Sequence, residues 1–115
     1  MNTTDTLDVT TQQAASAFIQ RLAQRVDFAA AILFGSRARH THTPDSDAEI
    51  AVILHGHPGG FVDTKLELAD IAYDVLLETG VRIQPLPIWE EEWEHPEHYP
   101  NPVLLHNIER EGIRL

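Results

Sequence analysis

The chain has 115 residues, no cysteine and a formal net charge of −10 at pH 7. Its length favours a single domain over residues 1–115. The polar start lacks a signal-peptide pattern, and no apolar run approaches the ~20 residues that cross a bilayer. We therefore expect a cytoplasmic protein without a membrane span. The acidic balance argues against non-specific binding to DNA or RNA, whose phosphates it would repel, and the absence of cysteine excludes disulfides and thiolate chemistry.

The first part of the chain predicts a helix followed by a buried strand. Residues 1–9 are expected to form a short frayed leader. Apolar residues recur at helical spacing from Gln12 to Arg25, after Thr10 and Gln13, which have the spacing of a capping box, and this pattern predicts an amphipathic helix. The continuous apolar run Phe28–Phe34 ends at a glycine and predicts a buried strand.

The middle of the chain predicts a second strand and the longest helix. Residues from Ser36 to about Arg39 can open a short helix, and a polar loop follows over residues 40–46. Asp47–Leu54 begins with alternation and becomes fully apolar, which predicts a second strand. After a glycine-rich loop, Phe61–Thr79 carries an apolar stripe at helical spacing, and Gly80 is well placed to end that helix.

The last part of the chain predicts one more strand and one more helix. Val81–Ile88 has the pattern of a third strand, and Pro85 and Pro87 place it at a sheet edge because proline has no N–H to donate. Residues 89–100 support no firm assignment. A helix is expected from Asn101-Pro102 to near Gly112. Three short strands alternating with helices predict a small α/β layer.

Gly35-Ser36 directly follow the first predicted strand and can form a phosphate cradle. Glycine lets a ligand approach the backbone, the first N–H groups of a helix are free to bind an anion, and Ser36 can donate its hydroxyl. Guanidinium groups suit phosphate, although at their spacing at most one of Arg37 and Arg39 reaches the same anion. Gly35, Ser36, Arg37 and Arg39 are therefore the candidate nucleotide-binding residues, although a Gly-Ser pair in this position is more often only a turn.

Asp47 and Glu49 project from one face of the second predicted strand, because residues i and i+2 share a face. Two carboxylates this close repel each other unless a cation or hydrogen-bond donors lie between them, and a hard divalent ion such as Mg²⁺ suits oxygen ligands. The alternative is a solvated strand start without a metal. A phosphate cradle and a carboxylate pair at adjacent strand ends are together the parts that phosphoryl-type transfer needs.

Gly35-Ser36, ten further residues and then Asp47-x-Glu49 resemble the signature of the polymerase-beta-type nucleotidyltransferase superfamily. The run Leu33-Phe34-Gly35-Ser36-Arg37-Ala38-Arg39 is especially similar to that of its minimal members, and the resemblance covers residues 12–112. It implies an α+β fold, layered like an α/β protein, in which a small mixed β-sheet has helices packed on one face. It also implies that the phosphates of ATP lie over Gly35 and Ser36, and that Asp47 and Glu49 hold Mg²⁺ as the catalytic residues.

The resemblance also implies a partner. Minimal members are often paired with a small all-helical HEPN protein in toxin–antitoxin modules, and some transfer AMP to a tyrosine of the toxin. The implied function is Mg-dependent transfer of AMP from ATP to a hydroxyl group of a HEPN-type partner, within a hetero-oligomer in which this chain is the antitoxin. The alternative is a catalytically silent binding module that neutralises a helical toxin by covering it, and a small-molecule acceptor fits a chain of this size less well.

Two residues depart from the family's pattern. Glu49 stands where aspartate is more usual, and its extra methylene moves the carboxylate by about one C–C bond, a distance to which catalytic geometry is sensitive. The family commonly supplies a third carboxylate from a later strand as metal ligand and general base. Gln84 is the residue of the third predicted strand that best matches this position, and glutamine cannot act as a base, which favours the binding module.

Histidine and tryptophan pairs offer weaker alternatives. Two His-x-His pairs, one of them His55/His57, could each share a face of an extended segment, but zinc needs three or four ligands with support around them. Solvated or structural histidines are the simpler interpretation, although His55 and His57 could still line the mouth of the site. Trp89 and Trp93 would share one side of a helix, where core packing and docking of a partner are both open.

Overall fold

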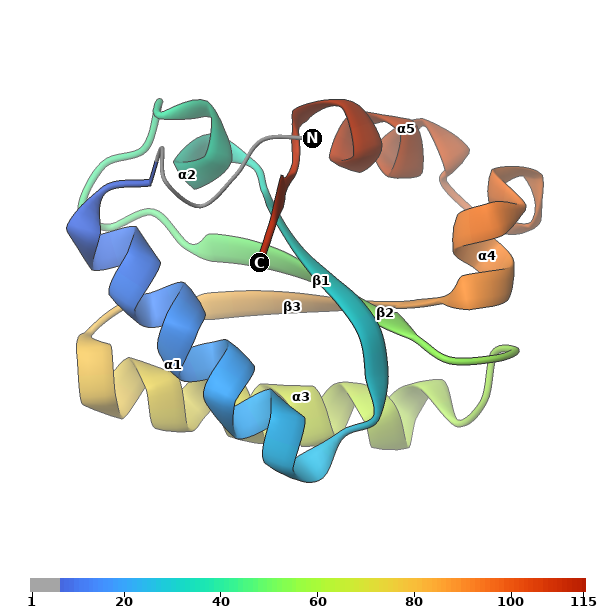
Figure 1. Ribbon diagram of the computed structural model, residues 1–115, viewed down its shortest axis with the longest axis horizontal. Coiled ribbons are helices and arrows are strands. Elements are labelled where there is room, and N and C mark those ends of the chain that lie inside the picture. Colours follow the sequence, from blue (N-terminus) through green and yellow to red (C-terminus); the bar gives the residue numbers. More distant parts are fainter. Residues whose placement is uncertain (1–6) are drawn as a thin grey trace.

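The computed structural model describes residues 7–115 and shows a four-stranded mixed sheet between helices (Figure 1). The strands lie in the order β3-β2-β1-β4, with β2 and β3 parallel and the other neighbouring pairs antiparallel. The expected α+β class with a small mixed sheet is confirmed. In chain order the elements are α1 (Val9–Arg25), β1 (Phe28–Phe34), α2 (Ser36–Arg39), β2 (Ala48–Leu54), α3 (Phe61–Thr79), β3 (Ile83–Trp89), α4 (Glu90–Glu94), the 3-10 turn η2 (Pro96–His98), α5 (Pro102–Glu111) and β4 (Ile113–Arg114).

Helices cover both faces of the sheet, which corrects the expectation that they pack on one face. Alternate residues of the strands point to opposite sides, so Leu33 packs in the core beneath α1 and α3, whereas its neighbour Ile32 packs against Leu105 and Ile108 of α5. The cause is the composition of β2, whose residues 50–54 are all apolar and buried. A strand that is apolar on both sides has to be covered on both sides.

The start of α1 differs from the expected frayed leader. Residues 1–6 of that leader lie outside the described residues, but Leu7 is buried in the core. Asp8 is the N-cap of α1, because its Oδ2 accepts a hydrogen bond of 3.1 Å from the N–H of Thr11. Aspartate is one of the strongest N-cap residues, so the helix begins earlier than the spacing of Thr10 and Gln13 predicted.

α3 has the predicted bounds and the predicted stop. Gly80 adopts a positive φ of 78° and donates its N–H to the carbonyl oxygen of Leu76 at 2.8 Å, a helix ending that glycine permits without strain. Charged residues recur along the helix. Within residues 7–115, no helix combines the length and the apolar character that crossing a membrane requires.

The chain around β3 and β4 contains the elements that were least clear from sequence. β3 lies at the sheet edge, as its prolines predicted. Trp89 is its last residue and packs in the core 6.5 Å from the ring of Phe61, whereas Trp93 belongs to α4 and packs on the other side of the sheet. The expectation that the two tryptophans share one side of a helix is therefore wrong. The short β4, which pairs with β1, was not predicted.

Candidate active site

β1 and β2 bring the two candidate motifs together. The strands are antiparallel, and Phe34 at the end of β1 pairs with Glu49 at the start of β2. The chain therefore enters Gly35-Ser36 beside the carboxylate pair. Gly35 has a φ of 79°, and a Cβ at this position would overlap Oε2 of Glu49. Only glycine leaves room for that carboxylate and adopts that backbone conformation freely, so the expected adjacency of cradle and carboxylates is present.

The cradle itself is a tight turn into α2. The N–H groups of Ala38 and Arg39 both donate to the carbonyl oxygen of Gly35 at 3.1 Å. In a helix of this kind the first N–H groups have no partner within the helix. Because α2 has four residues, its dipole is small, and anion binding here would depend on individual N–H groups and the Ser36 hydroxyl, which is half-buried.

Glu49 sits on the side of the sheet that faces α5, whereas Asp47 lines a hollow together with residues from the end of α3. Asp47 directly precedes β2, and Glu49 shares the face of Ala51 and Ile53, which pack in the α5 core. Both side chains are half-buried. The Glu49 carboxylate beside Gly35, with Asp47 two residues earlier in the chain, supplies the type of ligand that suits Mg²⁺, which proteins usually bind with one or two carboxylates and the phosphates of a substrate. Within residues 7–115, no group of three or more histidine, aspartate or glutamate side chains could hold a metal by itself.

Gln84, the residue that best matched the family's third carboxylate in the sequence, lies on β3 beside Glu49. In the parallel β2–β3 pair, Gln84 is the register partner of Glu49, and its side chain is exposed. A carboxylate at this position would lie beside the pair. The amide of Gln84 can donate and accept hydrogen bonds but cannot take up a proton in the neutral range.

A hollow of about 310 Å³ opens next to Asp47. Its walls come from the 44–47 loop and from the end of α3, and Arg82 lies on its rim. The carbonyl oxygen of Arg82 accepts a hydrogen bond of 2.9 Å from the N–H of Ala48, which fixes this residue beside the start of β2. Arg82 is an exposed cation at the site, and the sequence analysis did not single it out because no motif marks it.

Arg37 has a structural role, and its prediction as a nucleotide-binding residue is wrong. Its side chain is 1% exposed. The guanidinium group donates to the carbonyl oxygens of Ser46 at 3.0 Å and Pro44 at 3.2 Å, and to Oγ1 of Thr11 at 2.8 Å. These bonds hold the loop that leads into β2 against α1. The turn at Gly35 points Arg37 into the protein, which its position in the sequence does not reveal.

Arg39 points outward, as a residue that contacts a ligand should. Its side chain is 48% exposed, and Nη1 lies 3.3 Å from Oε2 of Glu111. Hydrogen bonds from Arg110 and Arg39 hold the pKa of Glu111 below its usual value. Arg39 is thus partly neutralised by α5, and its role in nucleotide binding stays a prediction.

His55 and His57 do not extend the site. His55 follows the last residue of β2, whereas Asp47 precedes its first residue, so they are separated by roughly 25 Å along the strand. His55 Nδ1 lies 3.1 Å from Oε1 of Glu90. The expectation that His55 and His57 could line the mouth of the site is wrong, because β2 carries them to its opposite end.

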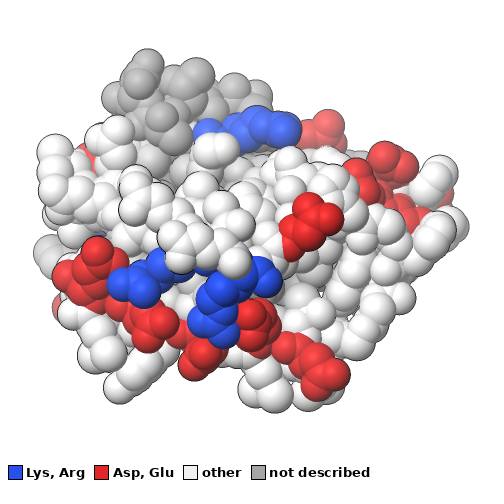
Figure 2. All heavy atoms as spheres, turned by 60° about the horizontal axis from the view of Figure 1, so that its bottom comes forward, with Lys and Arg blue, Asp and Glu red and all other residues white. Residues whose placement is uncertain are grey.

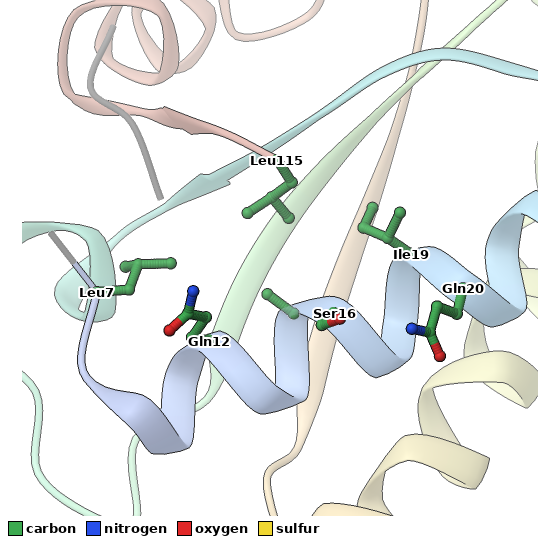
Figure 3. Close-up of a pocket in the computed structure, with 7 residues that line it drawn as sticks. Leu7, Gln12, Ser16, Ile19, Gln20 and Leu115 are labelled. Atoms are coloured by element: carbon green, nitrogen blue, oxygen red, sulfur yellow. The ribbon is translucent and has the colours of Figure 1, made fainter. Parts of the chain in front are cut away.

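A second hollow, of about 270 Å³, lies between the outer side of α1 and the chain end beside β4 (Figure 3). Leu7 and Leu115 face each other across it, and Gln12, Ser16 and Ile19 of α1 line its floor. Among residues 7–115, no aspartate, glutamate, lysine or arginine side chain lines this hollow. A triphosphate needs cations or a cradle of N–H groups, so the nucleotide site is expected at Gly35 and not here.

Comparisons with known proteins bear on the family and the fold of this chain. The nucleotidyltransferase domain family matches residues 15–112, which include every candidate site residue. A solved structure, a candidate nucleotidyltransferase from Sulfolobus solfataricus, is 16% identical and superposes with a TM-score of 0.50, covering 76% of this chain and 79% of that one. At this identity the likeness shows the fold. No curated protein matches the chain.

Proposed function

This chain belongs to the nucleotidyltransferase domain family, and we propose that it transfers AMP from MgATP to a hydroxyl group of a partner protein. The observation that carries the proposal is the contact of the Glu49 carboxylate with the backbone of Gly35. Because of this contact, the proposed phosphate-binding turn at Gly35 and the proposed metal ligand Glu49 lie next to each other. Family membership supports a transfer reaction in general, and the finer statements about metal, nucleotide and acceptor are our proposal.

The residues have separate roles in this proposal. The N–H groups after Gly35 and the Ser36 hydroxyl would donate to phosphate oxygens. Asp47 and Glu49 would hold Mg²⁺, which when bound neutralises charge on the phosphates. The acceptor oxygen would form a bond to the α-phosphorus as the bond to pyrophosphate breaks. Because Gln84 cannot take the proton of the hydroxyl, that proton would pass to another group or to the substrate itself.

The proposed acceptor is a tyrosine or other hydroxyl of a small helical protein of the HEPN type, with this chain as the antitoxin. What supports this choice is the run from Leu33 to Arg39, which is especially similar to that of minimal family members paired with such proteins. The acceptor would reach the site from the open side beside Asp47, where the hollow with Arg82 lies.

The second candidate function is a binding module that neutralises the same kind of partner without chemistry. The observation that favours it is the exposed amide of Gln84 at the register position beside Glu49. Without a third carboxylate the site has two metal ligands and no evident base. Complex formation alone would then explain an antitoxin.

The test uses ATP labelled at the α-phosphate, Mg²⁺ and a small helical protein of the HEPN type. We expect label on the partner with the wild-type chain and none with Asp47→Asn. Asp27→Asn is the matched control, because Asp27 is 92% exposed and lies at the other end of the sheet, next to His55. ATP labelled at the γ-phosphate should leave the partner unlabelled. A stable complex without any transfer would reject the enzyme and leave the binding module.

A further inference from the structure

α3 has an exposed apolar side that the core does not use. Its buried stripe consists of Leu68, Ile71, Ala72 and Val75. On the opposite side, residues separated by three or four positions form a second apolar stripe: Val62, Leu66, Ala69, Tyr73 and Leu77. Four of these are large side chains between 58% and 68% exposed. Single exposed apolar residues are ordinary, but a continuous stripe over four turns of one helix indicates a surface that another molecule covers.

A row of carboxylates borders this stripe on the side toward α1. The row consists of Asp63, Glu67, Asp70, Asp74 and Glu78. Arg25 of α1 lies 3.0 Å from Glu67 and 3.1 Å from Asp70, and Arg21 lies 3.2 Å from Glu78 and 3.8 Å from Asp74. Figure 2 shows these blue and red side chains gathered along one edge of the molecule. Five carboxylates against two arginines leave this row at a charge of −3 (5 − 2 = 3).

The stripe and the row meet in a shallow groove of about 580 Å³. Leu66, Ala69 and Tyr73 form its apolar wall, and carboxylates of the row form the other wall. The ion pairs along the row are solvent-exposed, and exposed pairs contribute little to stability. The carboxylates can therefore bind a new cation at low cost, while the apolar wall gains free energy when it is covered.

We propose that this α3 surface, defined as the stripe from Val62 to Leu77 with its bordering acidic row, docks an amphipathic helix of a partner protein. The docked helix has an apolar stripe bordered on one side by lysine or arginine. Helix-in-groove recognition uses anchors at spacings of three and four residues, which is the spacing of the α3 stripe. The acidic row selects the basic border and sets its direction by charge.

The charge pattern distinguishes this occupant from the others. A second copy of this chain would bring a second acidic row and a second charge of −10 to the interface, which repels. An anionic membrane surface and a nucleic acid are disfavoured for the same reason. The inference concerns binding alone and does not rest on the transfer chemistry, because neither Asp47, Glu49 nor Ser36 belongs to the surface.

The experiment measures fluorescence anisotropy of a labelled peptide with the full chain. The peptide is an idealised amphipathic helix of about 18 residues, or five turns, with a leucine stripe bordered by lysine. We expect Leu66→Gln and Tyr73→Gln each to weaken binding about tenfold, the effect of losing one well-packed anchor. Val103→Gln on α5 is the matched control, since Val103 is 65% exposed but lies elsewhere, and it should leave the affinity unchanged.

Two further comparisons test the charge. Glu67→Gln combined with Asp70→Asn should weaken binding and flatten its dependence on salt, and a peptide with glutamate in place of lysine should not bind. Equal binding by Leu66→Gln and wild type, or by the lysine and glutamate peptides, overturns the proposal. So does concentration-dependent self-association of the wild-type chain that Leu66→Gln removes, because the surface would then belong to a second copy. Circular dichroism confirms that each variant is folded.

Discussion

The two ends of β2 have the same kinds of residue but differ in how their carboxylates are satisfied. At the near end of β2, where Asp47 and Glu49 lie, the neighbouring Gly35 has a φ of 79°. At the far end, after Leu54, Gly56 has a φ of 82°. At the far end, the carboxylate of Glu90 accepts the N–H of Gly56 at 2.9 Å and contacts His55 at 3.1 Å. At the near end, no ion pair within residues 7–115 includes Asp47 or Glu49.

This difference suggests a structural role for the Glu90 carboxylate and a functional role for the carboxylates of Asp47 and Glu49. A carboxylate with fixed donors stabilises the loop that it bonds, whereas a half-buried carboxylate without such donors is left to bind a cation or a ligand. Keeping the second arrangement costs stability, which a protein tolerates where a cation or a ligand completes the site. The near end of β2 is therefore the place to look for chemistry, and the far end serves as its internal control.

The largest expected effect is on the rate of AMP transfer, when one carboxylate charge is removed at the near end of β2 and, for comparison, one at the far end. Glu49→Gln should lower AMP transfer about a thousandfold, or about 4 kcal/mol of activation free energy, because it removes a direct metal ligand, and even indirect ligand support is worth about 10–100-fold. Glu90→Gln should leave transfer unchanged. The measurement is the initial rate of label transfer from α-labelled ATP to the partner.

Unfolding by denaturant completes this comparison. Glu49→Gln should leave the free energy of unfolding within about 1 kcal/mol of the wild-type value, because no partner of the side chain is lost. If Glu49→Gln unfolded the chain, or if both variants transferred label equally, the distinction between the two ends would be mistaken.

The arginines after Gly35 sharpen the same comparison. Arg37→Ala should lower the free energy of unfolding by about 3 kcal/mol, because it leaves buried carbonyl oxygens and the Thr11 hydroxyl without their charged donor. Arg39→Ala should change it by less than about 0.5 kcal/mol, because an exposed ion pair contributes little. Urea unfolding of both variants measures the difference. Equal effects would contradict the assignment of Arg37 to the fold.

The glycines give a smaller, matched effect. Gly35→Ala meets a positive φ and a Cβ overlap with Glu49, and we expect it to lower the free energy of unfolding by roughly 2 kcal/mol. Gly56→Ala meets a positive φ but open space, so it should cost about 1 kcal/mol. Gly35→Ala should also displace Glu49 and reduce transfer. An equal loss of stability for both would show that Glu49 does not lie against Gly35 in solution.

Sequence patterns predicted the parts of this fold that depend on local periodicity. The apolar run Phe28–Phe34 and the stripe of Phe61–Thr79 have the predicted bounds, because a buried strand and an amphipathic helix have distinct spacings. The two motifs predicted that the Gly35-Ser36 cradle and the carboxylates lie at adjacent strand ends, and the contact between Gly35 and Glu49 was found in the structure. That contact needs an antiparallel β1–β2 pair, which ten intervening residues allow.

The features that the sequence did not predict depend on how the chain turns and packs in three dimensions, which local sequence patterns do not encode. Arg37 has a guanidinium group that suits phosphate, but a turn of the backbone points it into the protein. No local sequence pattern marks that turn. β4 is two residues long and is a strand only because it pairs with β1, so no periodic pattern could predict it. The outer stripe of α3 was not predicted, because helical spacing alone does not tell which apolar residues of a helix the core buries.

The smallest expected effect is the pH dependence contributed by the far end of β2. The N–H of Gly56, and then His55, hold the pKa of Glu90 below its ordinary value of 4.5. A carboxylate with a lowered pKa in the folded state stabilises the fold above its ordinary pKa, and this contribution is lost as the pH falls through the lowered value. The stability advantage of wild type over Glu90→Gln should therefore be constant near neutral pH, decline below pH 4.5 and disappear once the pH is below the lowered pKa of Glu90. Urea unfolding of the wild-type chain and of Glu90→Gln across this pH range measures the difference. A constant difference down to the most acidic pH would mean that Glu90 is not held by Gly56, and the contrast between the two ends of β2 would then rest on the near end alone.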